Sequence, residues 1–519
     1  MSRRSLPFLF LVVLVFLAPI AALVSEGLLS FGSFGWETAA VQLGRYAPST
    51  FLLLALSVVG ASVLGVSTAY LCARFEFSFR RTVVWLSLLP LAVPSYLVAY
   101  AWVDTLVDLG VHGGQLRNIP LTAFVFATCL SPYIFLPSYN AFRMIPKSLV
   151  ESAALLGKNR LTTFVKVELP LVWPSVFVGA SLVGMEVLAD FGTVDFMAVD
   201  TWSTGIFRSW FGLNDRARAA FLALILFAAS GVFLLWQLSA NSKKTLYSAL
   251  RSSALVQRRG TSLLASVPLL ATTFVAPFVS CLAPILILIY RTLVDSHTVE
   301  FSNLFTPTWT TFWVAITASV LVVTTGFFFA LASRLSGGQR LIAILLRLGT
   351  LGYAFPGGVL GVGLLIILSY FSLGGTLIAL FFAYVIRFVT IGANTIEAGW
   401  QTIPNRYFEQ ARLLGCTPVT GFIRVELPLL KKSIACAFVL CCIDVVKELP
   451  ATMLLMPLNF ETLALRTYNL ASDERLAETA PYSLLMIVVC GMGVLAAQKM
   501  GAFSLLAEDD AKAHETRAQ

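Results

Sequence analysis

Four acidic residues lie inside long apolar runs, where a charge is costly. Glu186 and Asp190 fall in one run and Asp444 and Glu448 in another, and each pair is four residues apart. A charge at the centre of a membrane helix costs roughly 2.5–3.5 kcal/mol on insertion scales, so such residues are functional candidates. The spacing predicts that both carboxylates of a pair share one helix face and line a translocation pathway suited to a hard cation. The alternative is that they lie near the outer ends of the spans, paired with basic side chains and solvated.

The other motifs do not favour nucleotide or metal chemistry on this chain. Residues 335–339 spell Leu-Ser-Gly-Gly-Gln, the signature of ABC ATPases, but no GxxxxGK[ST] loop is present to hold phosphates. We therefore interpret the match as a coincidence of turn chemistry between two apolar runs. The eight cysteines form no CxxC motif and only three histidines are present, so neither a metal site nor a cofactor is expected. A membrane-embedded enzyme is disfavoured for the same reason.

The composition identifies the elements that carry these residues. Of the 519 residues, 58% are hydrophobic and 12% are charged, whereas soluble domains are about 25% charged. A soluble multidomain enzyme is therefore excluded, and a lipid bilayer is the expected environment. The net charge of +9 lies in short loops rather than on one soluble face, so no nucleic-acid partner is expected.

Twelve apolar runs approach or exceed the roughly 20 residues that a membrane helix needs. They predict an all-α polytopic membrane protein with spans at 7–29, 48–73, 83–108, 120–142, 172–195, 218–239, 264–292, 309–333, 341–370, 374–399, 431–455 and 480–498. Twelve crossings place most of the 36 basic residues on one side, which the positive-inside rule identifies as cytoplasmic. Both termini are then cytoplasmic.

The chain contains an internal duplication. Residues 151–170 read ESAALLGKNRLTTFVKVELP and residues 409–428 read EQARLLGCTPVTGFIRVELP, which are identical at eleven of twenty positions. We predict a first half at 1–240, a cytoplasmic linker at 241–262, a second half at 263–498 and a polar cytoplasmic tail at 499–519. Because each half has six spans, both have the same orientation, with a pseudo-twofold axis along the membrane normal.

Each copy of the repeated segment lies in a predicted cytoplasmic loop, at about 143–170 and 401–428. Helix-forming residues lead to Gly157 or Gly415, where a helix stop or tight turn is expected. A second short helical stretch then leads to Leu-Pro, which opens the next span. The pattern predicts two short helices joined by a glycine, facing the cytoplasm twice.

This pattern resembles the EAA loop of binding-protein-dependent ABC importer permeases. It shares Glu-x-Ala, a glycine six residues after the glutamate, and a later Leu-Pro, but the second position is Ser152 or Gln410 rather than alanine. The resemblance implies the type I ABC importer permease (MetI-like) fold, with each loop docking on one of two copies of a separate cytoplasmic ATPase that uses ATP and Mg. The residues it assigns to ATPase coupling are Glu151, Ala153, Gly157, Leu169, Pro170, Glu409, Ala411, Gly415, Leu427 and Pro428.

Within this superfamily, the stretches 447–452 (KELPAT), 460–464 (FETLA) and 471–478 (ASDERLAE) resemble ferric-iron permeases, as do 189–194 (ADFGTV) and 204–208 (TGIFR). This resemblance implies import of ferric iron delivered by a periplasmic iron-binding protein, which would land on the loops near 196–217 and 456–478. Permeases for thiamine, phosphonate-type compounds and other small anions share the same plan and stay open as alternatives. An ion-coupled secondary transporter is a further alternative, but it does not explain two matched loops.

Overall fold

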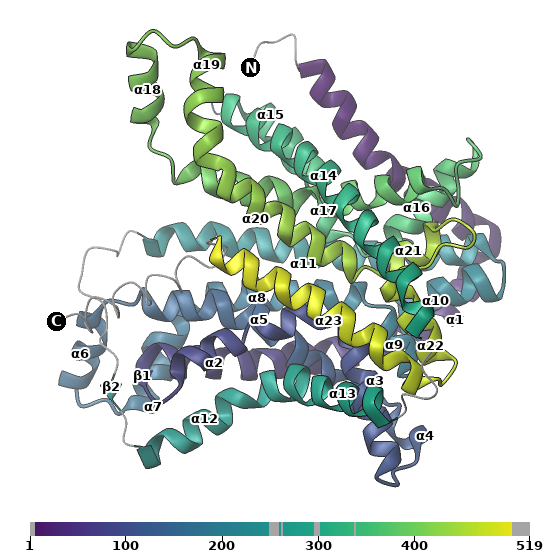
Figure 1. The fold of residues 1–519 in the computed structure, drawn as a ribbon, viewed down its shortest axis with the longest axis horizontal. Helices are drawn as coiled ribbons and strands as arrows, with labels where there is room; N and C mark the ends of the chain where they lie inside the picture. The colour runs from purple at the N-terminus through teal and green to yellow at the C-terminus, as the bar shows by residue number, and fades with distance from the viewer. Residues whose placement is uncertain (1–5, 249–258, 261–262, 295–300, 337–338, 501–519) are drawn as a thin grey trace. The chain divides into compact units, whose positions relative to one another are not determined.

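The computed structural model describes residues 6–248, 259–260, 263–294, 301–336 and 339–500. Nearly all of these residues are helical (Figure 1), and strands occur in the described part only as the parallel pair β1 (Phe75–Glu76) and β2 (Arg259–Gly260). The predicted all-α fold class is confirmed. Much of the predicted linker, nearly all of the predicted polar tail, and residues 337–338 of the Leu-Ser-Gly-Gly-Gln string lie outside the described residues.

Short connections join most successive helices of the described chain. The first part of the chain forms α1 (Leu6–Arg74), α2 (Arg80–Leu86), α3 (Ser95–Asp108), α4 (Gly113–Leu116), α5 (Ile119–Arg143), α6 (Lys147–Leu155), α7 (Arg160–Thr163), α8 (Leu169–Ala189), α9 (Gly192–Phe196), α10 (Trp202–Phe207) and α11 (Arg216–Ser248). The second part forms α12 (Leu263–Pro277), α13 (Ala283–Val294), α14 (Phe305–Leu335), α15 (Arg340–Gly349), α16 (Gly357–Ser369), α17 (Leu377–Gln401), α18 (Asn405–Leu413), α19 (Pro418–Gly421), α20 (Leu427–Val446), α21 (Pro450–Leu455), α22 (Leu463–Ser472) and α23 (Leu476–Lys499).

Nine helices of the described chain are long and apolar enough to cross a membrane, and they match nine of the twelve predicted spans. They are Leu9–Leu29, Gly35–Arg74, Ile119–Arg143, Arg160–Ala189, Arg216–Gln237, Ser266–Val294, Phe305–Leu335, Leu377–Gln401 and Ala477–Lys499. The first two belong to α1, which is kinked at Gly35, where φ is 71°. A polytopic membrane protein is therefore confirmed.

Two of the three remaining spans are broken at a proline. In the third predicted span, 83–108, the helical segments Arg80–Ala92 and Ser95–Asp108 meet at 95°. Val93 is extended because the ring of Pro94 disfavours helical geometry in the residue before it. The ninth predicted span, 341–370, divides in the same way into α15 and α16, with Phe355 extended before Pro356.

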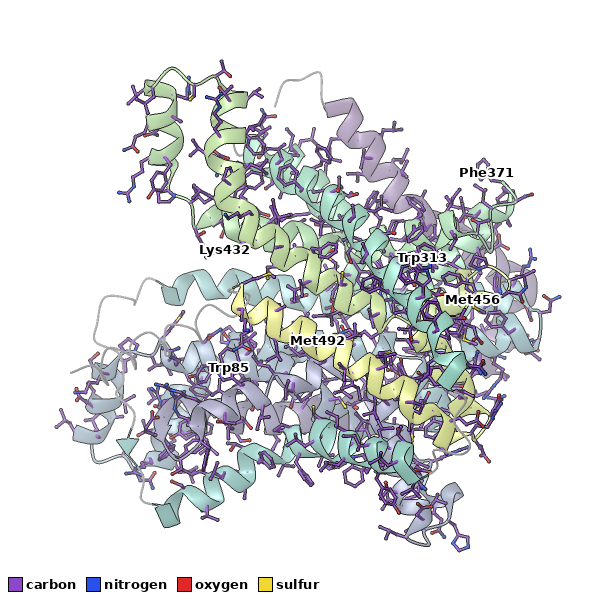
Figure 2. All side chains as sticks on the ribbon, viewed as in Figure 1. Trp85, Trp313, Phe371, Lys432, Met456 and Met492 are labelled. Atoms are coloured by element: carbon purple, nitrogen blue, oxygen red, sulfur yellow. The ribbon has the colours of Figure 1, made fainter. Side chains whose placement is uncertain are left out.

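The fifth predicted span of each half ends earlier than expected. The spans predicted at 172–195 and 431–455 are α8, which ends at Ala189, and α20, which ends at Val446, and each is followed by a short helix, α9 or α21. α20 is not among the nine apolar helices because Lys431, Lys432 and Asp444 lie within its 20 residues. Lys432 is exposed (Figure 2).

The chain forms two compact units that divide it differently from the sequence repeat. One unit comprises Met1–Ser25, Glu300–Arg466 and Leu485–Gln519, and the other comprises Glu26–Val299 and Thr467–Leu484. In the first unit, Phe16 packs on Phe329 with ring centroids 5.6 Å apart. In the second, α12 and α13 pack beside α2 and α3 (Figure 1). Each half of the repeat therefore contributes its first span to the unit that contains most of the other half.

Small residues allow two helices to approach closely at equivalent places in the two units. A Cβ added at Gly65 of α1 would lie 2.9 Å from the Ser131 carbonyl oxygen of α5, and one at Gly326 of α14 would lie 2.7 Å from the Ala393 nitrogen of α17. Such contacts are typical of helix packing in membranes. Large apolar side chains such as Phe51 and Phe328 are more than half exposed on the same helices, which suits a lipid-facing surface. Trp313 on α14 (Figure 2) instead packs against a ring of α17.

Candidate functional site

The first copy of the repeated segment, together with the four residues before it, forms what we call the first coupling element, Lys147–Pro170. α6 ends at Leu155, and Gly157 follows with φ 71°, a left-handed conformation that glycine adopts without strain. The Gly157 N–H donates to the Ala154 carbonyl at 2.9 Å and closes the helix. Asn159 then starts α7, since its side-chain oxygen accepts from the Thr162 N–H at 2.8 Å. The predicted pair of short helices joined by a glycine is confirmed here.

The second coupling element, Asn405–Pro428, has the same geometry. α18 ends at Leu413, and Gly415 follows with φ 83° and donates to the Arg412 carbonyl at 3.0 Å. The next residue, Cys416, donates to the Ala411 carbonyl at 3.0 Å. Two segments 258 residues apart thus adopt one conformation, although nine of their twenty aligned residues differ.

The residues assigned to ATPase coupling occupy equivalent environments in the two elements. Ala153 and Ala411 are buried, whereas Glu151 and Glu409 are exposed. Glu151 forms an exposed ion pair with Lys147 at 3.0 Å on the same helix. The small buried residue of each Glu-x-Ala therefore holds the helix in place, and the glutamate remains at the surface.

Two exposed leucine pairs lie beside the glycines and were not among the predicted site residues. The side chains of Leu155 and Leu156 are 89% and 76% exposed, and those of Leu413 and Leu414 are 87% and 85% exposed. Leucine is usually buried, and a repeated exposed pair marks an interaction surface. The signal was the Leu-Leu-Gly string, which is identical in both repeats.

The Leu-Pro pair of each element joins the short helices to the next span. Pro170 and Pro428 have no N–H to donate to the residue four positions earlier. A π-helical turn precedes each pair, at Phe164–Glu168 and Phe422–Glu426. Leu169 and Leu427 are half-buried and both prolines are exposed. Each element is thus continuous with α8 or α20 through a widened turn, and such turns are frequent at functional sites.

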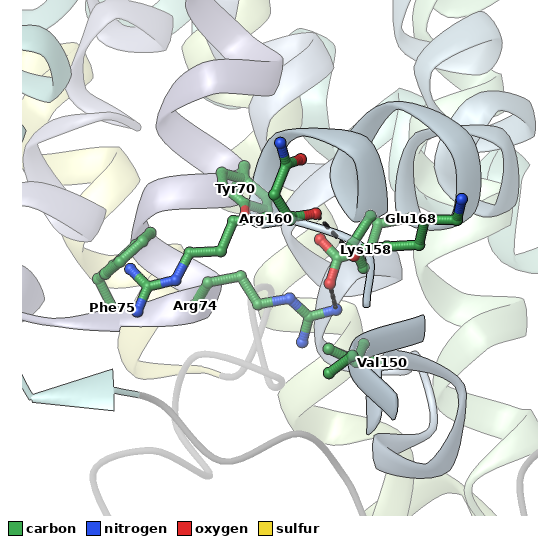
Figure 3. Close-up of a pocket in the computed structure, with 10 residues that line it drawn as sticks. Tyr70, Arg74, Phe75, Val150, Lys158, Arg160 and Glu168 are labelled. Carbon is green, nitrogen blue, oxygen red and sulfur yellow. Dashed lines mark hydrogen bonds and ion pairs between the residues drawn. The ribbon is translucent and has the colours of Figure 1, made fainter. Parts of the chain in front are cut away.

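A buried ion pair at the base of each element was also missed. Glu168 and Arg74 are 3.0 Å apart, with side chains only 4% and 7% exposed, beside a cavity of about 410 Å³ (Figure 3). In the second half, Glu426 lies 3.0 Å from Arg334 and accepts from the Trp400 indole N–H at 2.9 Å. The sequence signal for these ion pairs was the glutamate that precedes Leu-Pro in both repeats.

α8 ends at Ala189, between Glu186 and Asp190, so the two residues do not both lie within the helix, and their common face stays a prediction. Asp190 is in an extended conformation, with φ −70° and ψ 134°. Its carboxylate accepts from the Thr193 N–H at 2.8 Å and from the Ser95 hydroxyl at 2.8 Å, so it caps α9. Glu186 remains on α8, where the Tyr133 hydroxyl donates to it at 3.5 Å.

The end of α20 likewise separates Asp444 from Glu448, and their common face also stays a prediction. Asp444 lies on α20, 2.8 Å from the Lys447 ammonium, whereas Glu448 follows the end of that helix. Glu448 is buried and accepts from the N–H groups of Ala451 at 3.1 Å and Thr452 at 3.0 Å, so it caps α21.

A basic side chain approaches Glu448 from the fourth span of the second half. The guanidinium of Arg387 lies 3.7 Å from the Glu448 carboxylate, and its side chain is 13% exposed. A Cβ at Gly357 would lie 2.4 Å from that guanidinium and 2.6 Å from the carboxylate, so a larger residue here would have to displace the ends of both side chains. In the described part of the chain, no three His, Cys, Asp or Glu residues are grouped so that they could hold a metal ion. The four acidic residues remain predicted pathway residues, two of which also cap helices.

The predicted landing loop near 196–217 presents a cluster of charges. Asp200 lies between Arg45, at 3.2 Å, and Arg208, at 2.9 Å, and all three side chains are at least one-third exposed. Tyr468 donates to Asp195 at 2.6 Å within the same compact unit. Burial, reinforced by the Asp195 carboxylate, raises the pKa of the Tyr468 phenol, so the hydroxyl remains a donor.

Comparison with known proteins finds a match in both halves. The family model described as "Binding-protein-dependent transport system inner membrane component" matches residues 61–245 and 322–498. The chain is 24% identical over 464 residues to an Fe(3+)-transport system permease protein of Haemophilus influenzae, covering 88% of this chain and 90% of that protein.

Two further relatives each correspond to less than half of the chain. A probable molybdenum ABC transporter permease protein of Haloferax volcanii is 26% identical over 245 residues, which are 44% of this chain and 87% of that protein. A sulfate transport system permease protein of Salmonella typhimurium is 25% identical over 255 residues, which are 45% of this chain and 92% of that protein. A duplicated chain is expected to match relatives of half its length over almost the whole of those relatives.

Proposed function

Because the chain belongs to the family of binding-protein-dependent transport system inner membrane components, we propose that it imports ferric iron as the permease of an ABC transporter. It is an integral inner-membrane transport component. In the proposal, iron(III) arrives on a periplasmic binding protein and two copies of a separate ATPase supply the energy. The chain itself binds no ATP and performs no covalent chemistry.

The observation that carries the proposal is the pair of matching coupling elements. Each presents an exposed Leu-Leu pair beside a rigid glycine turn, and each leads without interruption into α8 or α20. Two equivalent surfaces suit two copies of one partner. An ion-coupled transporter has no need of such surfaces, so the elements favour an attached motor.

The elements transmit movement by alternating access in this proposal. When the ATPases close on ATP, the two elements approach one another and the helices they lead into change their tilt. The pathway then opens in turn to the binding protein and to the cytoplasm, where both termini lie. Glu186, Asp190, Asp444 and Glu448 are proposed to border that pathway.

Iron is favoured as the substrate by the relative that spans most of this chain, which is named for Fe(3+) transport. Carboxylates along the pathway are consistent with a hard cation. The second candidate is an oxyanion such as sulfate, molybdate or a phosphonate. It is supported by the shorter relatives and by Arg387, whose Nε and Nη1 atoms have no hydrogen-bond acceptor in the structure.

Uptake by cells that lack this chain, with and without a plasmid copy, separates the substrates. Labelled iron(III), sulfate, molybdate, 2-aminoethylphosphonate and thiamine are supplied singly at low concentration. The proposal expects the plasmid to restore iron uptake alone. Restoration of an anion or of thiamine in place of iron would assign the chain to that substrate and reject iron.

A further inference from the structure

Each coupling element is tied to the second span of its half by an ion pair with a buried glutamate. Arg74 is the last residue of α1, and Arg334 is the penultimate residue of α14. Their Nη2 atoms lie 3.0 Å from the Oε1 atoms of Glu168 and Glu426, the last residues of the two π-helical turns. The same polar contact therefore occurs twice, at equivalent points of the repeat.

These contacts lie where the helix would otherwise bend easily. The proline that follows each glutamate removes a hydrogen bond from the helix, and the widened turn is free to bend there. Packing does not enclose this point fully. A cavity of about 410 Å³ is lined by Arg74 and Glu168, and one of about 470 Å³ is lined by Arg334 and Trp400.

Placing an ion pair at such a position costs desolvation free energy. Two buried charges lose their hydration, and apolar residues of similar size often give equal or better stability. Because the pair occurs in both halves, we attribute it to a need to fix the relative position of two helices, and not to a gain in folding free energy. In the second half Arg334 donates a hydrogen bond to Glu426 at 3.0 Å, and this bond fixes direction as well as distance because the guanidinium is planar. In the first half the Arg74–Glu168 contact is an ion pair without hydrogen-bond geometry, so it fixes the distance between the two helices.

We propose that Arg74–Glu168 and Arg334–Glu426 are transmission joints that make each coupling element move together with the end of the second span. This inference rests on the proposed function, since it assumes that a motor moves the elements. Through the Leu-Pro turn alone, that movement reaches only α8 or α20. Through the joint it also reaches α1 or α14, so two helices of each half respond to one motor. All four residues are positioning residues.

The two joints differ in their surroundings. In the first half both side chains are at least 93% buried. In the second half Arg334 is 26% exposed, and its guanidinium lies 5.5 Å from the centre of the Trp400 ring, which also donates to Glu426. Trp400 holds Glu426 when Arg334 is replaced, so we expect the first joint to be the more sensitive.

The test uses the full chain in lipid nanodiscs, alone and with its ATPase. The variants are Glu168→Gln, the neutral pair Arg74→Gln with Glu168→Gln, and the exchanged pair Arg74→Glu with Glu168→Arg. The matched control is Asp104→Asn, which removes the carboxylate from another partly buried pair of the same unit, 2.6 Å from Arg291. The neutral pair leaves no lone buried charge, so it keeps the test valid even where the single variant folds poorly.

Amide hydrogen exchange of residues 160–168 in the chain alone measures the joint directly. We expect exchange about tenfold faster in the single variant and the neutral pair, and near the wild-type rate in the exchanged pair and the control. Unchanged exchange in the neutral pair would overturn the joint whether or not the chain is an importer.

Substrate moved per ATP hydrolysed measures transmission. We expect the neutral pair to bind the ATPase and hydrolyse ATP, yet to move about threefold to tenfold less substrate per ATP, with recovery in the exchanged pair. If the neutral pair moves as much substrate per ATP as the wild type, or if the exchanged pair does not regain the wild-type value, the transmission role is overturned. Failure of the wild-type chain to bind any ATPase would instead reject the proposed function, while the exchange measurement still decides the joint.

Discussion

Removal of the exposed leucines should detach the motor without harming the fold. The change is Leu155→Ala with Leu156→Ala in the first element and the same change at Leu413 and Leu414 in the second. These side chains are 76–89% exposed, so they contribute little to the packing of the free chain. A purified variant is therefore expected to keep the melting temperature of the wild type.

The expected loss of affinity follows from the area that docking would cover. Leu→Ala removes three carbons, or about 2.4 kcal/mol for full burial at about 0.8 kcal/mol per carbon. If docking covers about half of each side chain, two leucines lose about 2.4 kcal/mol per element, which weakens binding roughly fiftyfold.

Binding of the purified ATPase to immobilised permease, measured over a range of ATPase concentrations, reports this change. Leu458→Ala is the matched control, because Leu458 is 97% exposed and lies outside both elements. An ATPase affinity within twofold of wild type in the four-leucine variant would refute the assignment of these leucines to docking.

Three further changes test other parts of the structure. Glu151→Lys with Glu409→Lys should abolish uptake in cells but leave the amount of inserted chain unchanged, and normal uptake would contradict the coupling role of these glutamates. Glu448→Ala should impair iron uptake more than assembly, even though loss of this cap also leaves Arg387 without its carboxylate; a fully active variant would remove Glu448 from the pathway. Gly363→Ala should lower the melting temperature, because the added Cβ would lie 2.4 Å from the Pro19 carbonyl oxygen. Gly231→Ala is the control and should not lower it, because the space around Gly231 is open. Equal melting temperatures of the two variants would contradict the packing of the first span against α16.

Local features of the structure were largely predictable from the sequence. Long apolar runs located nine spans, because crossing a membrane requires a continuous apolar helix. The glycine stops at Gly157 and Gly415 followed from the repeat, because a left-handed turn after a helix favours glycine.

Features that depend on neighbours in space were not predictable. The helix ends before Asp190 and Glu448 were missed because both lie in stretches that are apolar enough to continue the span. The Asp190 carboxylate accepts a hydrogen bond from Ser95, which is distant in sequence, and Glu448 lies 3.7 Å from Arg387 of another helix. The Arg74–Glu168 pair joins residues 94 positions apart, and the packing of residues 6–25 with the second half leaves no periodic signal.

In the proposed function, this chain moves its substrate only when a separate ATPase drives it. The most direct measurement is entry of labelled iron(III) into proteoliposomes that contain the chain, its ATPase and the iron-loaded binding protein, with ATP available to the ATPase. We expect iron to enter with the intact ATPase and not with an ATPase that is unable to hydrolyse ATP. Entry that continues without ATP hydrolysis, or that follows an imposed proton gradient instead, would contradict it.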